Sequence, residues 1–246
     1  MTDPAAPVRV SHDRGIAVVT LDSPHNRNAL SSALVSGVRA ALDEAAGAPG
    51  TRAVLLTHTG NTFCAGADLT ERHPTGPAEL TALLRALVES PKPVVGRTTG
   101  HVRAGGLGLL AACDIAVAGP RATFAFTEAR LGLAPSVISL TVLPRMRPRD
   151  AERYYLTGEV FDADQAVRTG LVSAGDEALD GILDGLRAAS PQGLAESKRL
   201  TGAAVLRSFD RDARVLAEQS ARLFASAEAA EGVRAFLERR EAPWAL

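Results

Sequence analysis

The alternation of strongly apolar runs with helical segments constrains the fold of this chain more than any other feature of its sequence. Continuous apolar runs at 53–57, 94–96 and Ile115–Ala118 have the composition of strands buried on both faces. Between them, apolar residues recur at helical spacing over 78–89 and 106–112. The alternation predicts an α/β fold with a largely parallel sheet.

The two ends of the chain differ in their predicted structure. Near the N-terminus, the runs 8–12 and Ile16–Leu21 flank the turn-forming triplet Asp13-Arg14-Gly15, which predicts a hairpin. Ser31 or Ser32 then caps a helix that ends at Gly47. From about residue 147 the strand signals stop, and helical spacing follows over 150–156, 163–169, 176–188, 191–203 and 208–239, with a break at 225–227. We therefore expect an α/β core over residues 1–190 and a helical region over 191–246.

Charge and cysteine content exclude several classes of protein. Lys and Arg total 27 against 28 Asp and Glu, so the net charge of -1 gives no field that would attract nucleic acid or an anionic membrane. The two cysteines, Cys64 and Cys113, indicate neither a disulfide framework nor a metal site. The first ten residues lack the pattern of a signal peptide, and no apolar run approaches the length of a membrane span. We expect a soluble cytoplasmic protein.

Two segments rich in small residues follow predicted strands. The first, 61–69, contains Ala65-Gly66-Ala67, and the second, 100–115, contains Gly105-Gly106. Neither has the spacing of a nucleotide-binding loop. Small residues leave backbone N–H groups accessible, and two such donors over one pocket would stabilise negative charge on a carbonyl oxygen. An ordinary strand-to-helix loop is the alternative interpretation of either segment alone.

In these segments the chain resembles the enoyl-CoA hydratase/isomerase (crotonase) superfamily. The matching motifs fall in the family's order and cover nearly the whole chain. They are Asn26-Arg27-Asn28-Ala29-Leu30, Phe63-Cys64-Ala65-Gly66-Ala67-Asp68-Leu69, Gly105-Gly106 before Cys113-Asp114-Ile115, Glu128 before Leu131-Gly132, and the helix-like 228–240. Within the superfamily, 128–139 looks most like single-glutamate bacterial members similar to 3-methylglutaconyl-CoA hydratases.

The resemblance implies a spiral of ββα units with a helical C-terminal region that builds homotrimers, which can pair into hexamers. It implies acyl-CoA thioester substrates and no cofactor or metal. By motif position, the N–H groups of Ala67 and Gly105 would hold the thioester oxygen. The coenzyme A groove would be lined by residues carried over from the motifs, which are Asn26, Arg27, Ala65, Gly66, Asp68 and Gly106.

Hydratases of the superfamily use two glutamates. By motif position, the resemblance implies that this chain has only one of them. Gly108 stands at the first position, and Glu128 at the second. Desolvation among apolar neighbours would raise the pKa of Glu128 into the range useful for proton transfer. We expect a 2-enoyl-CoA hydratase, with a branched or dicarboxylic acyl group left open. The alternatives are a Δ3,Δ2-enoyl-CoA isomerase and a non-catalytic acyl-CoA-binding protein.

Five further residues near these motifs have open roles. Arg103 fits either a substrate carboxylate or coenzyme A phosphate, or a structural ion pair, for example with Asp114. Ser139 is a candidate for holding a water molecule. His101 has no acid partner in the sequence pattern, which favours a solvated or packed histidine. We interpret Cys64 as a small loop residue and Cys113 as a strand residue.

Overall fold

The computed structural model describes residues 6–71 and 75–246, and the larger of two sheets in this part of the chain runs through its centre. The strand order is β1-β2-β3-β5-β7-β10. The first two strands form the predicted antiparallel hairpin, and the others pair in parallel. The bounds are β1 Val8–Asp13, β2 Ile16–Leu21, β3 Ala53–His58, β5 Val94–Thr98, β7 Ile115–Ala118 and β10 Ala174–Gly175.

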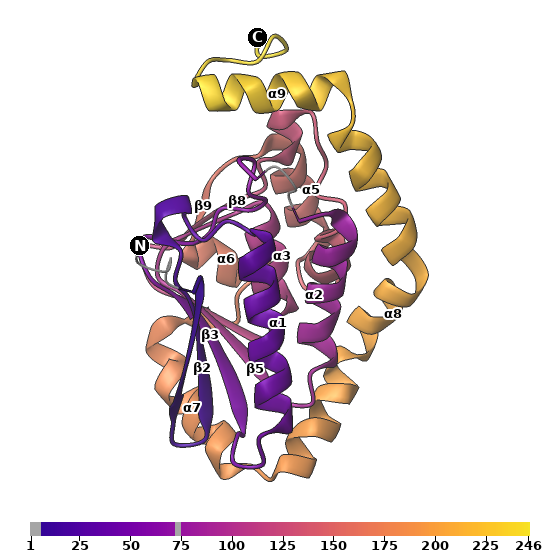
Figure 1. The fold of residues 1–246 in the computed structure, drawn as a ribbon. Helices are drawn as coiled ribbons and strands as arrows, with labels where there is room; N and C mark the ends of the chain where they lie inside the picture. The colour runs from indigo at the N-terminus through magenta and orange to yellow at the C-terminus, as the bar shows by residue number, and fades with distance from the viewer. Residues whose placement is uncertain (1–5, 72–74) are drawn as a thin grey trace.

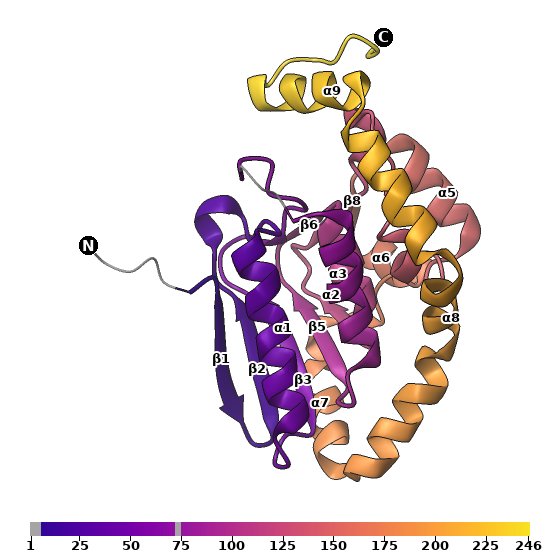
Figure 2. The ribbon, with the colours of Figure 1, turned by 45° about the vertical axis from the view of Figure 1, so that its right-hand side comes forward.

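Helices cover both faces of this sheet, as Figures 1 and 2 show, which explains why its strands read as continuous apolar runs. On one face lie α1 (Ser32–Gly47), α2 (Pro77–Glu89) and α3 (Gly105–Ala112), packed on residues such as Val54 and Leu56. On the other face lies α7 (Leu179–Ala188), packed on their neighbours Ala53 and Leu55. Ser31 is the N-cap of α1, since its hydroxyl accepts a hydrogen bond from Leu34 N.

A second sheet of short strands lies at one end of the first. Its order is β4 (Thr62–Cys64), β6 (His101–Arg103), β8 (Thr123–Ala125) and β9 (Phe161–Asp162). Each of β3, β5 and β7 is followed by a strand of this sheet, so the chain winds in the expected ββα turns. Strands of two or three residues are too short to show a periodicity, so no local pattern in the sequence predicts them.

Two expectations about the C-terminal half are wrong. Strands do occur after residue 147, since β9 and β10 complete the two sheets. The segments 191–203 and 208–239 do not start separate helices; α8 runs unbroken over Pro191–Phe224, and the break lies at Ser226, which caps α9 (Ala227–Glu238). The remaining helices are α4 (Ser139–Val142), α5 (Pro148–Thr157) and α6 (Ala163–Thr169). A domain boundary at residue 190 stays a prediction.

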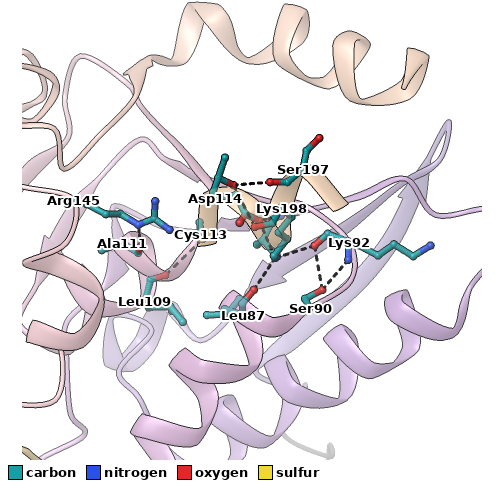
Figure 3. A network of polar contacts seen from close by, with 12 residues as sticks. Leu87, Ser90, Lys92, Leu109, Ala111, Cys113, Asp114, Arg145, Ser197 and Lys198 are labelled. Atoms are coloured by element: carbon teal, nitrogen blue, oxygen red, sulfur yellow. Dashed lines mark hydrogen bonds and ion pairs between the residues drawn. The ribbon is translucent and has the colours of Figure 1, made fainter. Parts of the chain in front are cut away.

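A buried lysine fastens α8 to the α/β body (Figure 3). Lys198 Nζ lies 2.8 Å from Asp114 Oδ2 and donates hydrogen bonds to the carbonyls of Leu87 and Lys92 at 2.8 and 3.1 Å. The same Asp114 oxygen accepts from Val94 N at 2.7 Å. Burial lowers the pKa of the Lys198 ammonium, and the Asp114 carboxylate opposes that effect. Asp114 therefore pairs with Lys198, and the suggested ion pair between Arg103 and Asp114 is wrong.

Among helices of the described residues, none combines the length and apolarity that crossing a membrane requires.

Candidate functional site

The two small-residue segments meet in the structure. Gly66 has φ +91°, and a Cβ atom on it would lie 2.9 Å from Ala104 Cβ and 3.3 Å from Gly105 N. Reciprocally, a Cβ atom on Gly105 would lie 2.8 Å from Leu30 Cδ1 and 3.9 Å from Ala67 N. A side chain at Gly66 would push the segments apart, whereas a Cβ atom on Gly105 would press on Leu30 and only touch the loop. The loop after β4 and the N-terminus of α3 are therefore in direct backbone contact.

Both backbone amides singled out from the sequence are available as donors. Within residues 6–71 and 75–246, the N–H groups of Ala67 and Gly105 have no hydrogen-bond acceptor, whereas Ala65 N donates to Arg27 O at 3.2 Å. Gly105 is the first residue of α3, where N–H groups have no partner within the helix and the dipole favours negative charge. The structure thus brings together two unused donors from different turns of the spiral.

The turn before α3 is strained. Ala104 has φ +46°, a value that residues with a Cβ atom rarely adopt, at a cost of about 1–3 kcal/mol. Its N–H donates to Ala125 O at 3.2 Å, which fixes the turn to β8. Gly106 permits the close approach of α3 to β4, because a Cβ atom there would lie 2.6 Å from Cys64 O. The conformation that presents the Gly105 amide is therefore imposed by packing.

Glu128 is buried at the start of the 3-10 helix η2 (Glu128–Leu131), three residues after β8. The residue is 8% exposed, and its Oε2 atom is buried without a hydrogen-bond partner among the described residues. Desolvation raises the pKa of this carboxyl to about 7, although its own backbone N–H partly opposes the effect. A group with that pKa exists in both protonation states at neutral pH, as proton transfer requires.

The space beside Gly108 is filled by an isoleucine. A Cβ atom on Gly108 would lie 2.4 Å from Ile138 Cγ2 and 2.7 Å from Ile138 Cβ. Ile138 is itself 3% exposed. Gly108 therefore leaves no room for a longer side chain while Ile138 keeps its position. No local signal in the sequence predicts this contact, because the two residues lie thirty positions apart in the chain.

A tyrosine and a serine lie beside the Glu128 turn. The ring of Tyr155 contacts that of Phe126 with a centroid distance of 4.6 Å, and burial together with Glu128 raises the pKa of its phenol. Ser139 Oγ donates to Pro135 O at 2.7 Å and lies 3.4 Å from Tyr155 Oη. Tyr155 also lines an apolar hollow of about 440 Å³, whose other walls are Leu143, Pro148, Ala151, Glu152 and Leu156. The Ser139 hydroxyl is thus already hydrogen-bonded within the protein, and its role in holding a water molecule stays a prediction.

Among the side chains predicted to line a coenzyme A groove, Asn26 and Asp68 bind each other. Asp68 accepts from Thr70 N at 3.0 Å, Thr70 Oγ1 at 2.6 Å and Asn26 Nδ2 at 3.0 Å. Burial raises the pKa of the Asp68 carboxyl, but these hydrogen bonds outweigh it and hold the pKa below its ordinary value. Arg27 is exposed with φ +59°. Asn28, fully buried, donates to the carbonyls of Thr59 and Thr62, so it braces the loop from inside.

Arg103 and His101 project toward the start of β8. Arg103 donates to Val102 O at 2.9 Å, Thr123 O at 2.7 Å and Thr123 Oγ1 at 2.9 Å. In the described part of the chain no carboxylate pairs with it. His101 Nδ1 lies 2.8 Å from Thr123 Oγ1, and desolvation followed by the Arg103 charge lowers the pKa of the imidazole. Recognition of a substrate anion by Arg103 stays a prediction.

Neither cysteine has the environment of a nucleophile. Cys64 is fully buried as the last residue of β4, which corrects its interpretation as a loop residue. Cys113 is also buried, but it is the C-cap of α3 and lies before β7 (Ile115–Ala118), so its interpretation as a strand residue is wrong. Burial raises the pKa of each thiol to about 12, so thiolate is scarce at neutral pH.

Comparisons with known proteins agree on one family. The family model described as enoyl-CoA hydratase/isomerase matches residues 11–245. A crystal structure of an enoyl-CoA hydratase from Mycobacterium avium is 54% identical, covers 98% of this chain and 100% of its own, and superposes with a TM-score of 0.91. A Thermus thermophilus relative with enoyl-CoA hydratase in its name is 31% identical over 92% of this chain and 95% of that protein. The cyclohexa-1,5-dienecarbonyl-CoA hydratase of Thauera aromatica is 30% identical over 99% of each chain.

Proposed function

Because the chain belongs to the enoyl-CoA hydratase/isomerase family and has the fold of its solved relatives, we propose that it is a hydratase that adds water to a 2-enoyl-CoA thioester through one glutamate. The observation that carries the proposal is the buried carboxyl of Glu128, whose Oε2 atom has no hydrogen-bond partner among the described residues and whose pKa is raised to about 7. The names of relatives across the full length of the chain support hydration as the reaction.

In the proposed reaction, the two free amides bind the thioester oxygen and the carboxylate transfers the proton. The N–H groups of Ala67 and Gly105 donate to the thioester oxygen and stabilise the negative charge that develops there. The Glu128 carboxylate takes a proton from water while the water oxygen bonds to Cβ, and the electron pair of the double bond moves to Cα. Glu128 then returns that proton to Cα, so the group ends in its starting state. All the catalytic groups belong to the chain, and we propose no cofactor beyond the coenzyme A of the substrate.

Isomerisation is the second candidate, and Ile138 favours it. An apolar side chain stands where a second carboxylate would orient water, whereas moving a double bond needs only one base that removes a proton and returns it. In that reaction Glu128 would take the proton from Cα of a 3-enoyl-CoA and return it to the γ-carbon. The same two amides would stabilise the intermediate enolate.

Three measurements on one set of variants separate these functions. The parent, Glu128→Gln and Glu44→Gln are assayed for hydration of crotonyl-CoA and isomerisation of a 3-enoyl-CoA, and for binding of a saturated acyl-CoA. Glu44 lies exposed on α1 and serves as the matched control. We expect the parent and Glu44→Gln to hydrate, and Glu128→Gln to lose about 10²–10⁴-fold in rate while still binding the saturated thioester.

Other results would change the conclusion. Turnover of the 3-enoyl-CoA alone would establish the isomerase. Binding of the saturated thioester by a parent that turns over neither substrate would establish the non-catalytic alternative. Full activity of Glu128→Gln would refute the proposed role of this carboxylate.

We also propose that the protein acts in the cytoplasm as a homotrimer or a dimer of trimers. Phe224, Phe236 and Leu237 support the assembly, since about half of each side chain is exposed on α8 and α9. Apolar groups of that size on neighbouring helices favour contact with another subunit.

A further inference from the structure

The turn that carries Glu128 is in backbone contact with a helix a hundred residues further along the chain. Gly132, which ends η2 with φ +69°, is so close to α9 that a Cβ atom on it would lie 2.9 Å from the carbonyl carbon of Glu228. Gly232 of α9 makes the reciprocal approach, because a Cβ atom on it would lie 2.4 Å from Leu131 O and 2.6 Å from the carbonyl carbon of Leu131. Because these two glycines have no side chain, the backbones of η2 and α9 pack in direct contact.

The face of α9 that meets η2 consists of small residues. Ala229, Gly232 and Ala235 recur every three residues and are buried, whereas Phe236 and Leu237 are more than half exposed. Residues three apart lie on one face of a helix. Figures 1 and 2 show α9 lying across the end of the molecule, where it follows α8. Backbone therefore meets backbone at this contact, and no flexible side chain is available to absorb a displacement.

The other side of η2 is held by the end of α5. A Cβ atom on Gly158, the C-cap of α5, would lie 3.0 Å from Phe126 O and 2.9 Å from Arg130 Nε. The Arg130 guanidinium donates to Thr157 O through Nε at 3.2 Å and Nη2 at 3.1 Å. The turn from Phe126 to Gly132 is thereby enclosed between the end of α5 and α9.

We infer that α9 is a positioning element for the Glu128 carboxylate and that Gly232 is the positioning residue at their contact. The inference rests on the proposed function of Glu128. Confinement between α5 and α9 keeps the carboxylate buried, with Oε2 free of partners among the described residues, and a shift of η2 would turn it toward solvent or away from the substrate. A misplacement of about 1 Å can cost about 100-fold in rate.

The test is Gly232→Ala, with Gly185→Ala as the matched control. Gly185 lies in α7, where nothing is within 4 Å of an added Cβ atom, so that variant makes the same change in a helix without a clash. For Gly232→Ala we expect kcat to fall about 10–100-fold with KM changed less than about twofold, because the amide donors are untouched. The acid limb of its pH–rate profile should also move below that of the parent, since an exposed carboxyl titrates lower. Gly185→Ala should keep both parent values.

A second variant approaches the same contact from the opposite side. Gly132→Asn keeps a residue that tolerates positive φ but adds a Cβ atom against Glu228, and it should reproduce the loss of kcat. Binding of a saturated acyl-CoA confirms that each variant is folded. A variant that loses this binding together with activity counts against the inference, which predicts damage confined to Glu128.

Including Glu128→Gln in the series separates the two proposals. If Glu128→Gln is inactive while Gly232→Ala and Gly132→Asn retain the parent kcat and pH profile, the positioning role is wrong and the proposed function stands. If Glu128→Gln keeps parent activity, the proposed function fails, whatever the glycine variants do.

Discussion

Replacing Glu128 with glutamine should make the protein more stable at alkaline pH, by an amount that the burial of the carboxyl sets. Burial raises the pKa of Glu128 from 4.5 to about 7 in the folded protein. Each pKa unit corresponds to about 1.4 kcal/mol, so ionising this group costs the folded state about 3 kcal/mol. Glutamine has the same shape and no charge, and it removes that cost.

The pH dependence follows from the direction of the shift. Below pH 4.5 the carboxyl is protonated in both the folded and the unfolded chain, so the effect is absent there. Between 4.5 and about 7 the folded chain binds more protons than the unfolded chain, and stability falls as pH rises. Above about pH 7 the full destabilisation is present. The advantage of the glutamine variant should therefore grow by about 3 kcal/mol from acid to alkaline pH.

Urea unfolding of parent and variant at about pH 4.5 and about pH 9 measures this quantity, since other carboxyls contribute equally to both proteins and cancel. Glu44→Gln, on the exposed surface of α1, controls for replacing a carboxyl elsewhere. A difference between Glu128→Gln and the parent that stays constant across this pH range would refute the reasoning. It would mean that the carboxylate is solvated or paired in the folded protein.

Three further outcomes are expected. Gly108→Ala should lower stability by about 1–3 kcal/mol in thermal or urea unfolding, because its Cβ atom meets Ile138. Lys198→Met should cost about 3–5 kcal/mol, since it leaves the partly buried Asp114 carboxylate without its cation, and urea unfolding alongside the double variant with Asp114→Asn should show partial recovery. Light scattering at micromolar concentration should return a mass several times 25.6 kDa, and Phe236→Asp should reduce it; a parent mass near 25.6 kDa contradicts the proposed assembly.

Local patterns in the sequence predicted the elements that extend over many residues. The helix Ser32–Gly47 and the strand Ile115–Ala118 have these bounds because a cap, a glycine or an apolar run marks them locally. Where no such mark exists, prediction failed: α8 continues through 204–207 because its buried residues, Lys198, Gly202, Val205 and Phe209, keep helical spacing across that stretch. The short strands of the second sheet are held by pairing between distant segments, which a local pattern does not record.

By itself, the sequence determined the α/β class and the family motifs, with Glu128 and Gly108 at two positions of those motifs. These properties depend on residue types at fixed spacing along the chain. The tertiary structure alone decided how buried Glu128 is, that Ile138 fills the space beside Gly108, and that Gly232 packs on Leu131. The reason is that burial and steric fit depend on which distant segments pack together. The same dependence assigned Asp114 to Lys198, because a buried charge pairs with whichever opposite charge the fold brings within reach.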